Sequence, residues 1–257
     1  MKKRAMRDRE GLFIIEGVRV LEEAINFNGS LEEVLVVEDK VEEIKSLLCR
    51  ASGEVPLRVV SPSVIEEITT VVTPQGVYAV AEQNDLGYED FISRDLDFVI
   101  IASSVRDPGN LGVLLRVADA AGADGVISTP DSVDIFNPKV VRAACGAHFH
   151  IPIVREIELE MSASDLRSKG IKIFGLDPHE GKPYEEEDLT VPVAFVFGNE
   201  AEGLSEKETK FIDEKLKIDM PGKAESLNLG SAAAIVLFEV VRQRKGARKE
   251  RENCLRE

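Results

Sequence analysis

The sequence predicts an α/β protein whose larger, C-terminal part is a mostly parallel sheet with helices on both faces. Three observations predict it. Short apolar runs alternate with helical patterns along residues 96–245, which is typical of strands buried between two helix layers. A smaller alternation of the same kind fills residues 1–90, and a polar segment separates the two units. The chain of 257 residues is long enough for both.

The N-terminal unit, residues 1–90, is expected to be a small α/β domain. Its expected elements are a helix at 18–25, a strand at 34–37, a helix at 41–48 and a strand at 77–81. Ser61-Pro62-Ser63, followed by Glu66, predicts a further helix with proline in its first turn and a capping box. The polar residues 84–95 interrupt the periodicity and are predicted to be the linker.

The C-terminal unit, residues 96–245, is expected to supply the parallel sheet. Its predicted strands lie at 98–102, 126–128, 151–154, 171–175, 193–197 and 216–220. Its predicted helices lie at 111–121, 138–145, 164–169, 206–215 and 229–244, and a basic tail occupies residues 246–257. Because ligand sites in parallel α/β sheets form at the carboxyl ends of strands, chemistry is expected in the loops that follow the strands.

Composition argues against several classes of protein. No apolar run approaches the roughly 18 residues of a membrane span, and no apolar segment follows the basic start, so neither membrane anchoring nor export is expected. The three cysteines are far apart, which favours a reduced, cytoplasmic location over a disulfide framework. They are Cys49, Cys145 and Cys254. The three histidines have no cysteine or carboxylate cluster at metal-ligand spacing beside them, so no metal site is predicted.

The charge distribution gives a mixed indication about nucleic acid. The formal net charge of −15 argues against a phosphate-rich partner, because an acidic surface repels it at long range. Both ends of the chain are nevertheless basic. Residues 242–257 hold seven basic and three acidic side chains, and the first nine residues include Lys2, Lys3, Arg4, Arg7 and Arg9. These ends either fray into solvent or contact phosphate groups.

The loop after the predicted strand at 98–102 is the first candidate site. Asn110 is expected to cap the helix that follows, and Gly112 allows a ligand or another backbone to approach the first turn. Arg116 lies on the same helix. It either pairs with Asp119 one turn on, or uses its two-pronged guanidinium to hold a phosphate or ribose oxygen.

Two later loops are the second and third candidates. Residues 198–203 leave a buried strand, and Ser205 with Glu208 has the spacing of a capping box. Residues 221–228 begin with a rigid Pro-Gly turn and lead into a helix that opens with the small residues 230–234. Each loop either lines a small-molecule pocket or is an ordinary turn with a helix cap.

Three common catalytic signatures are missing from the sequence. The first turn of the C-terminal unit reads Asp-Pro-Gly-Asn-Leu-Gly, where a dinucleotide-binding fold needs G-x-G-x-x-G. Neither a Walker loop nor a G-x-S-x-G nucleophile elbow occurs. A nicotinamide-dependent dehydrogenase, a P-loop nucleotidase and a serine hydrolase are therefore poorly supported.

Taken in order, the three loops resemble the motifs of the SpoU/TrmH family of RNA ribose 2′-O-methyltransferases. The first motif is met by Asn110, Gly112 and Arg116. The second is met by Gly198, Asn199, Glu200 and Gly203, and the third by Pro221, Gly222, Ser226, Leu227 and Asn228. The opening Phe13-Ile14-Ile15-Glu16-Gly17 is similar to a substrate-binding domain often attached to such enzymes.

The resemblance implies a fold and an activity. The fold is of the SPOUT class, in which the last segments thread through a loop as a trefoil knot, and the protein is a homodimer. The cofactor is S-adenosylmethionine, bound at the knot, and no metal is needed. The implied catalytic residues are Arg116, Asn110, Glu200, Ser226 and Asn228. The implied cofactor-binding residues are Thr129, Gly198, Ile218, Met220 and Leu227.

The substrate that the resemblance implies is RNA, with ribosomal RNA favoured over transfer RNA by analogy of the first domain. A non-catalytic RNA-binding module and a nucleotide-dependent oxidoreductase are the alternatives. Arg116 either clamps the acceptor electrostatically or accepts its proton. Phosphate contacts are expected from the basic ends of the chain and from Arg106, Arg116, Lys139 and Arg142.

Overall fold

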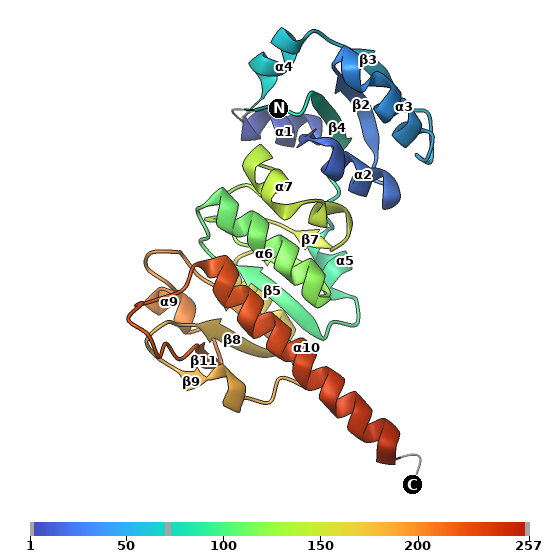
Figure 1. Cartoon of the computed structure of the whole chain (residues 1–257). Helices are drawn as coiled ribbons and strands as arrows, with labels where there is room; N and C mark the ends of the chain where they lie inside the picture. Colours follow the sequence, from blue (N-terminus) through green and yellow to red (C-terminus); the bar gives the residue numbers. More distant parts are fainter. Residues whose placement is uncertain (1–2, 70–72, 255–257) are drawn as a thin grey trace.

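The computed structural model describes residues 3–69 and 73–254, with side chains up to residue 249, and Figure 1 shows its two sheets, one above the other. The N-terminal sheet has four strands in the order β1-β4-β2-β3. The C-terminal sheet has seven strands in the order β7-β6-β5-β10-β8-β11-β9. Lys2 and the last three residues of the basic tail lie outside the described residues.

The N-terminal sheet mixes antiparallel and parallel pairs. Its strands are β1 (Leu12–Glu16), β2 (Leu31–Val36), β3 (Leu57–Val59) and β4 (Val77–Glu82). Its helices are α1 (Arg4–Glu10), α2 (Val18–Asn26), η1 (Glu38–Lys40), α3 (Val41–Leu48) and α4 (Pro62–Ile68). The capping box predicted for α4 is wrong: Ser61 precedes the helix, but its hydroxyl lies 2.8 Å from the Ser63 hydroxyl instead of bonding a backbone N–H.

Every strand pairing in the C-terminal sheet is parallel, where a mostly parallel sheet was predicted. Its strands are β5 (Phe98–Ala102), β6 (Gly125–Ser128), β7 (Ile153–Val154), β8 (Lys172–Leu176), β9 (Lys182–Pro183), β10 (Val193–Phe197) and β11 (Glu214–Lys217). All residues of the neighbouring strands β5 and β10 are buried, which explains why these two segments contain no polar side chain.

Helices cover both faces of this sheet, so the predicted fold class is confirmed. One core cluster contains side chains from α6 (Pro108–Ala121), α7 (Pro138–Ala144) and α10 (Leu229–Cys254). A second core cluster contains side chains from α5 (Tyr88–Ile92) and α8 (Leu159–Ser168). Residues that follow α9 (Glu206–Thr209) pack against this second cluster. The C-terminal unit also contains two short 3-10 helices, η2 (Ala147–Phe149) and η3 (Tyr184–Glu186). The trefoil knot stays a prediction.

The helix predicted at 206–215 is wrong in length, because α9 is a single turn. It ends at Thr209, and Asp213 is already bonded to the neighbouring strand β8. The Asp213 backbone N–H donates to the Ile173 carbonyl at 2.9 Å, and its carboxylate accepts from the Ile173 N–H at 2.8 Å. These bonds bring the chain to the sheet edge, so strand β11 begins at Glu214 and ends before the predicted strand would.

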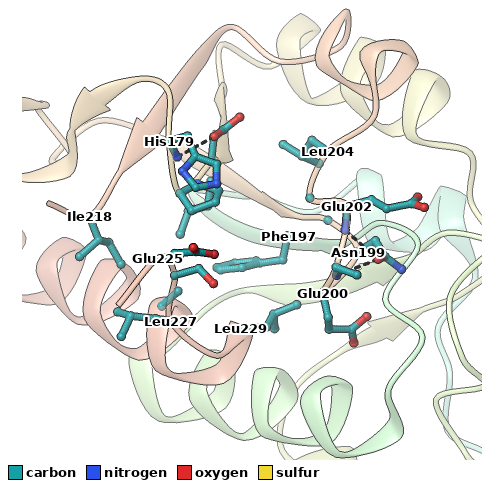
Figure 2. Close-up of a pocket in the computed structure, with 18 of the residues that line it drawn as sticks. His179, Phe197, Asn199, Glu200, Glu202, Leu204, Ile218, Glu225, Leu227 and Leu229 are labelled. Atoms are coloured by element: carbon teal, nitrogen blue, oxygen red, sulfur yellow. Dashed lines mark hydrogen bonds between the residues drawn. The ribbon is translucent and has the colours of Figure 1, made fainter. Parts of the chain in front are cut away.

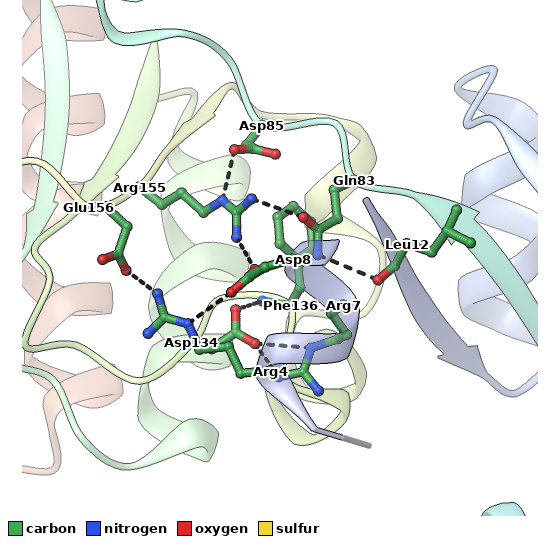
Figure 3. A network of polar contacts seen from close by, with 10 residues as sticks. All are labelled: Arg4, Arg7, Asp8, Leu12, Gln83, Asp85, Asp134, Phe136, Arg155 and Glu156. Atoms are coloured by element: carbon green, nitrogen blue, oxygen red, sulfur yellow. Dashed lines mark hydrogen bonds and ion pairs between the residues drawn. The ribbon is translucent and has the colours of Figure 1, made fainter. Parts of the chain in front are cut away.

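Helix α1 joins the two units through ion pairs, which removes Arg7 from the basic side chains expected to contact phosphate (Figure 3). Arg7 is only 2% exposed and forms an ion pair with Asp134 of the C-terminal unit. The Arg155 guanidinium donates to Asp8 at 2.8 Å and to Asp85 at 2.7 Å. Since a buried charge is costly unless it is paired, Arg7 is part of the fold and is not available to RNA.

His148 is buried between the two units, and its imidazole ring is neutral. It is fully buried, stacks 5.9 Å from the Phe13 ring centroid, and its Nε2 lies 2.8 Å from the Ile135 carbonyl oxygen. Nε2 therefore carries the proton, and Nδ1 has no hydrogen-bond partner within the described ranges. Burial, which disfavours the imidazolium ion, lowers the pKa of His148 to about 4.

A pH dependence of stability follows from this neutral histidine. The unfolded chain binds a proton at His148 near its ordinary pKa of about 6.5, while the folded chain does not, so stability falls as the pH falls from about 6.5 towards 4. We expect the free energy of unfolding to fall by about 2 kcal/mol between pH 7.5 and pH 5 because of His148. Denaturant unfolding of wild type and His148→Phe at both pH values measures the difference. Equal losses in both proteins would contradict it.

Candidate functional site

A cavity of about 370 Å³ lies where strands β8, β10 and β11 end (Figure 2). Its apolar wall includes Leu176, Pro178, Phe197, Leu204, Leu216, Ile218, Met220, Leu227 and Leu229. Its polar wall includes Asp177, His179, Asn199, Glu200, Glu202, Glu225 and Ser226. The second and third sequence motifs thus meet in one cavity at the carboxyl edge of the sheet, where parallel α/β folds bind ligands.

The second motif forms a tight loop with a fixed shape. The Asn199 side-chain oxygen accepts from the backbone N–H groups of Ala201 and Glu202 at 2.9 and 3.1 Å, and Asn199 and Gly203 exchange two backbone hydrogen bonds. A Cβ atom on Gly198 would lie 2.5 Å from the Gly203 carbonyl oxygen, so only glycine fits there. The capping box predicted after the loop, between Ser205 and Glu208, is confirmed.

A chain of hydrogen bonds links the three motifs at one side of the cavity. The Asn228 side-chain oxygen accepts from the Gly230 N–H at 2.9 Å, so its NH₂ group faces outward and donates to the Asn110 oxygen at 2.8 Å. The Asn110 NH₂ group then donates to the Glu200 carboxylate at 3.2 Å. Because a backbone donor sets the first amide, the orientation of every amide in the chain is determined.

Glu200 is held as a carboxylate by this chain and by the loop of the first motif. Its two oxygens accept from the backbone N–H groups of Asp107 at 2.9 Å and Arg106 at 3.2 Å. Partial burial favours the neutral acid, but these N–H donors and Asn110 outweigh it, and the pKa of Glu200 lies below its ordinary value. Glu200 is therefore an acceptor that positions the loop.

The expected N-cap of helix α6, Asn110, is wrong. Asp107 is the N-cap, and its side-chain oxygen accepts from the Asn110 N–H at 2.8 Å, whereas Asn110 lies inside the first turn. This arrangement leaves the Asn110 amide to join Glu200 and Asn228. Gly112 is required one turn later, because a Cβ there would lie 2.5 Å from the Ala143 side chain of α7.

Arg116 lies apart from the cavity in the single chain. It is exposed on α6, and its Nη1 lies 3.7 Å from the Cys145 sulfur at the end of α7. It does not pair with Asp119, whose carboxylate instead contacts His150 at 2.9 Å. The structure therefore brings together Asn110, Glu200 and Asn228, with Ser226 on the cavity wall, but not Arg116.

Four of the five residues expected to bind the cofactor line the cavity, namely Gly198, Ile218, Met220 and Leu227. Thr129 does not. Its hydroxyl accepts from the Ser104 N–H at 3.1 Å, and it lines a second cavity of about 440 Å³ on the other side of the loop at 199–203. Thr129 thus shapes the loop after β5 in this structure.

Several residues that line the cavity lie outside the predicted set of site residues. Phe197 and Leu229 adjoin motif residues and could have been found from the strand and helix they belong to. His179 follows strand β8 at its carboxyl end, which is a positional signal, but its loop carries no motif. Glu225 directly precedes Ser226. Within residues 3–69 and 73–254 there is neither a group of three metal-ligating side chains nor a helix suited to spanning a membrane.

Comparison with known proteins gives matches over both units. Residues 97–238 match the model of the SpoU rRNA Methylase family, and residues 1–79 match an MRM3-like substrate binding domain. A 23S rRNA (guanosine(2553)-2′-O)-methyltransferase of Bacillus subtilis is 34% identical, over 91% of this chain and 90% of its own length. A 23S rRNA (guanosine-2′-O-)-methyltransferase of Bordetella pertussis is 36% identical, over 67% and 72% respectively.

Solved structures agree with these matches. The SpoU methyltransferase AviRb from Streptomyces viridochromogenes, in complex with the cofactor AdoMet, has a TM-score of 0.84 and 30% identity, and the alignment covers 94% of each chain. An AdoMet-bound rRNA methyltransferase from Sinorhizobium meliloti has a TM-score of 0.80 and 30% identity, over 94% of this chain and 91% of that one. With Asn110, Glu200 and Asn228 of its three motifs linked by hydrogen bonds and both units matched, this chain belongs to the SpoU rRNA methylase family.

Proposed function

We propose that this protein methylates a ribose 2′-hydroxyl of ribosomal RNA, with S-adenosylmethionine as the methyl donor. The observation that carries the proposal is the hydrogen-bonded chain of Glu200, Asn110 and Asn228 beside a cavity of about 370 Å³. The named 23S rRNA relatives support ribosomal RNA over transfer RNA.

The cavity suits the methyl donor by shape and chemistry. Ile218, Met220 and Leu227 give an apolar wall for a neutral adenine, and polar side chains occupy the rest of the lining. S-adenosylmethionine supplies, when bound, a methyl group on a good leaving group, so the protein has to orient an acceptor hydroxyl and ease its deprotonation. Ser226 on the cavity wall, and Asn110 and Asn228 in the hydrogen-bonded chain that reaches the lining residue Glu200, would orient that hydroxyl.

A homodimer would bring Arg116 to this site. Three large apolar side chains are exposed on the adjacent helices α6 and α10: Val113 at 37%, Ile235 at 37% and Phe238 at 47%. Arg116 follows Val113 by three residues and so projects from the same face of α6. A two-fold partner covering this face would place its own Arg116 near the cavity of the first copy. There the guanidinium would stabilise negative charge developing on the acceptor oxygen.

RNA contacts are assigned to exposed cations near the site and on the tail. Arg106 and Lys139 are exposed and have no ion-pair partner among the residues that the structure describes. Arg244, by contrast, is bound to Asp97 at 2.8 Å and belongs to the body of the protein. The last turns of α10 project away from both sheets (Figure 1) and expose Lys245, Arg248 and Lys249. Unpaired cysteines and an RNA substrate support the cytoplasm as the location.

The contribution of the tail can be measured by salt dependence. Changing Lys245, Arg248 and Lys249 together to glutamine is expected to weaken RNA binding and to reduce the slope of log K against log salt by about 2, because fewer counterions are released. Filter binding at several salt concentrations measures the slope. Lys169→Gln, on the opposite helix layer, is the single-charge control and should leave the slope unchanged. An unaltered slope in the triple variant would remove the tail from the interface.

The proposed activity is tested by transfer of a labelled methyl group from S-adenosylmethionine to purified RNA. Label in ribosomal RNA, located on a ribose by mass mapping, supports the proposal. Label in transfer RNA alone would change the substrate to transfer RNA. RNA binding without transfer, in the presence of a bound donor, would make the protein a binding module instead.

A further inference from the structure

The polar groups of the cavity fall into two sets, those already bonded within the protein and those available to a ligand. Asp177 is bonded to the N–H groups of His179 and Glu180 and to Lys215. Asn199 is bonded within its own loop, and Glu200 is bonded to the loop of the first motif, as described above. The available set consists of the His179 ring, Glu202, Glu225 and Ser226, which have no side-chain partner among the described residues. Sequence motifs assign a role only to Ser226.

The available groups lie at different ends of the cavity. In Figure 2, Glu202 lies on the side of Asn199 and Glu200, whereas Glu225 and His179 lie on the side of Ile218 and Leu227. In the proposed function the acceptor hydroxyl is oriented beside the hydrogen-bonded chain of Glu200, Asn110 and Asn228, so the methyl group of the donor faces that side. The apolar wall at Ile218 suits the adenine. Glu225 is therefore next to the part of the donor that adjoins the adenine.

We propose that Glu225 holds the adenosine ribose of the methyl donor, by accepting hydrogen bonds from its hydroxyl groups. This inference rests on the proposed function. A carboxylate only accepts hydrogen bonds, and the part of the donor next to the adenine offers two hydroxyl donors. Acidic side chains bind ribose hydroxyls in the same way in dinucleotide-binding folds. Glu225 is thus a positioning residue, which sets the depth of the donor and hence the place of its methyl group.

The experiment compares ligands that differ only in the ribose. Isothermal titration measures the Kd of S-adenosylhomocysteine and of its 2′-deoxy and 3′-deoxy analogues, for wild type and Glu225→Ala. Wild type is expected to lose about tenfold or more in affinity when the bonded hydroxyl is removed, as is usual for a hydrogen bond to a charged group. Glu225→Ala is expected to bind S-adenosylhomocysteine about tenfold more weakly and to distinguish the analogues by less than about threefold.

A matched control removes the same charge from the other end of the cavity. Glu202→Gln is expected to keep the wild-type preference for the ribose ligands, and Glu225→Gln to keep part of it. Equal discrimination by wild type and Glu225→Ala would overturn the proposal. A second result would also overturn it: Glu225→Ala loses the same affinity for all three ligands, while its binding of methylthioadenosine, which lacks the amino-acid end, is unchanged. Glu225 would then contact the ammonium group of the donor. No binding of S-adenosylhomocysteine to wild type would instead contradict the proposed function.

Discussion

Arg116→Ala is expected to lower kcat for RNA methylation by about 10²–10³-fold, the usual effect of removing one preorganised group that stabilises charge in a transition state. The melting temperature should change little, because Arg116 is exposed and its described contact is a weak one, at 3.7 Å to the Cys145 sulfur. Single-turnover methyl transfer at saturating RNA measures the loss. Arg116→Lys is the matched control: it keeps the charge without the two-pronged geometry and should recover only part of the rate.

Mixed dimers test whether Arg116 acts across the two-fold axis. A dimer of one Arg116→Ala copy and one Glu200→Ala copy contains one complete site if the arginine comes from the partner, and none if it acts within its own chain. We therefore expect the purified mixed dimer to have about half of the wild-type activity, while each variant alone is nearly inactive. An inactive mixed dimer would place Arg116 in its own chain's site. Full activity of Arg116→Ala alone would remove the residue from catalysis.

The parallel sheet could be predicted because its signal is local. Strands β5 and β10 are buried on both faces, so each shows as an unbroken apolar run. Helix α1 could not be predicted in this way. The buried residue of α1 is Arg7, and the partner of Arg7, Asp134, lies 127 positions away. Because this partner is not visible in the local sequence, the basic segment looks like a solvated end of the chain. Similarly, α9 ends at Thr209, and Asp213 then bonds to Ile173 of strand β8, a contact 40 positions away that no local pattern shows.

The sequence predicted which residues belong to the site, but not how they are arranged in space. The motif spacing indicated Asn110, Glu200 and Asn228, yet the bond between Asn110 and Asn228 joins residues 118 positions apart and depends on the crossing of α6 and α10. The direction of Arg116 was also beyond the sequence, because it depends on the packing of Gly112 against α7. Glu225 had no signal of its own, since an exposed carboxylate in a polar loop is the ordinary case.

Asn110→Asp is expected to reduce methyl transfer by about 10²-fold or more at pH 8, because it replaces the donor in the hydrogen-bonded chain by a second carboxylate. The new group would stand 3.2 Å from Glu200, which is already ionised by its bonds to the backbone of Asp107 and Arg106. Two carboxylates at this distance repel, so one of the two pKa values must rise. As the pH falls through that raised pKa, a proton returns to the pair and a donor is restored.

The activity ratio of Asn110→Asp to wild type should therefore increase as the pH is lowered from 8 to 6, and taking the ratio cancels the pH dependence of the acceptor itself. Asn110→Ala is the control, since it removes the donor without adding a charge, and its ratio should stay constant over the same range. A constant ratio for Asn110→Asp would mean that the two carboxyl groups do not interact. Glu200 would then act independently of Asn110, and the hydrogen bonds that link Glu200, Asn110 and Asn228 would not be needed for methyl transfer.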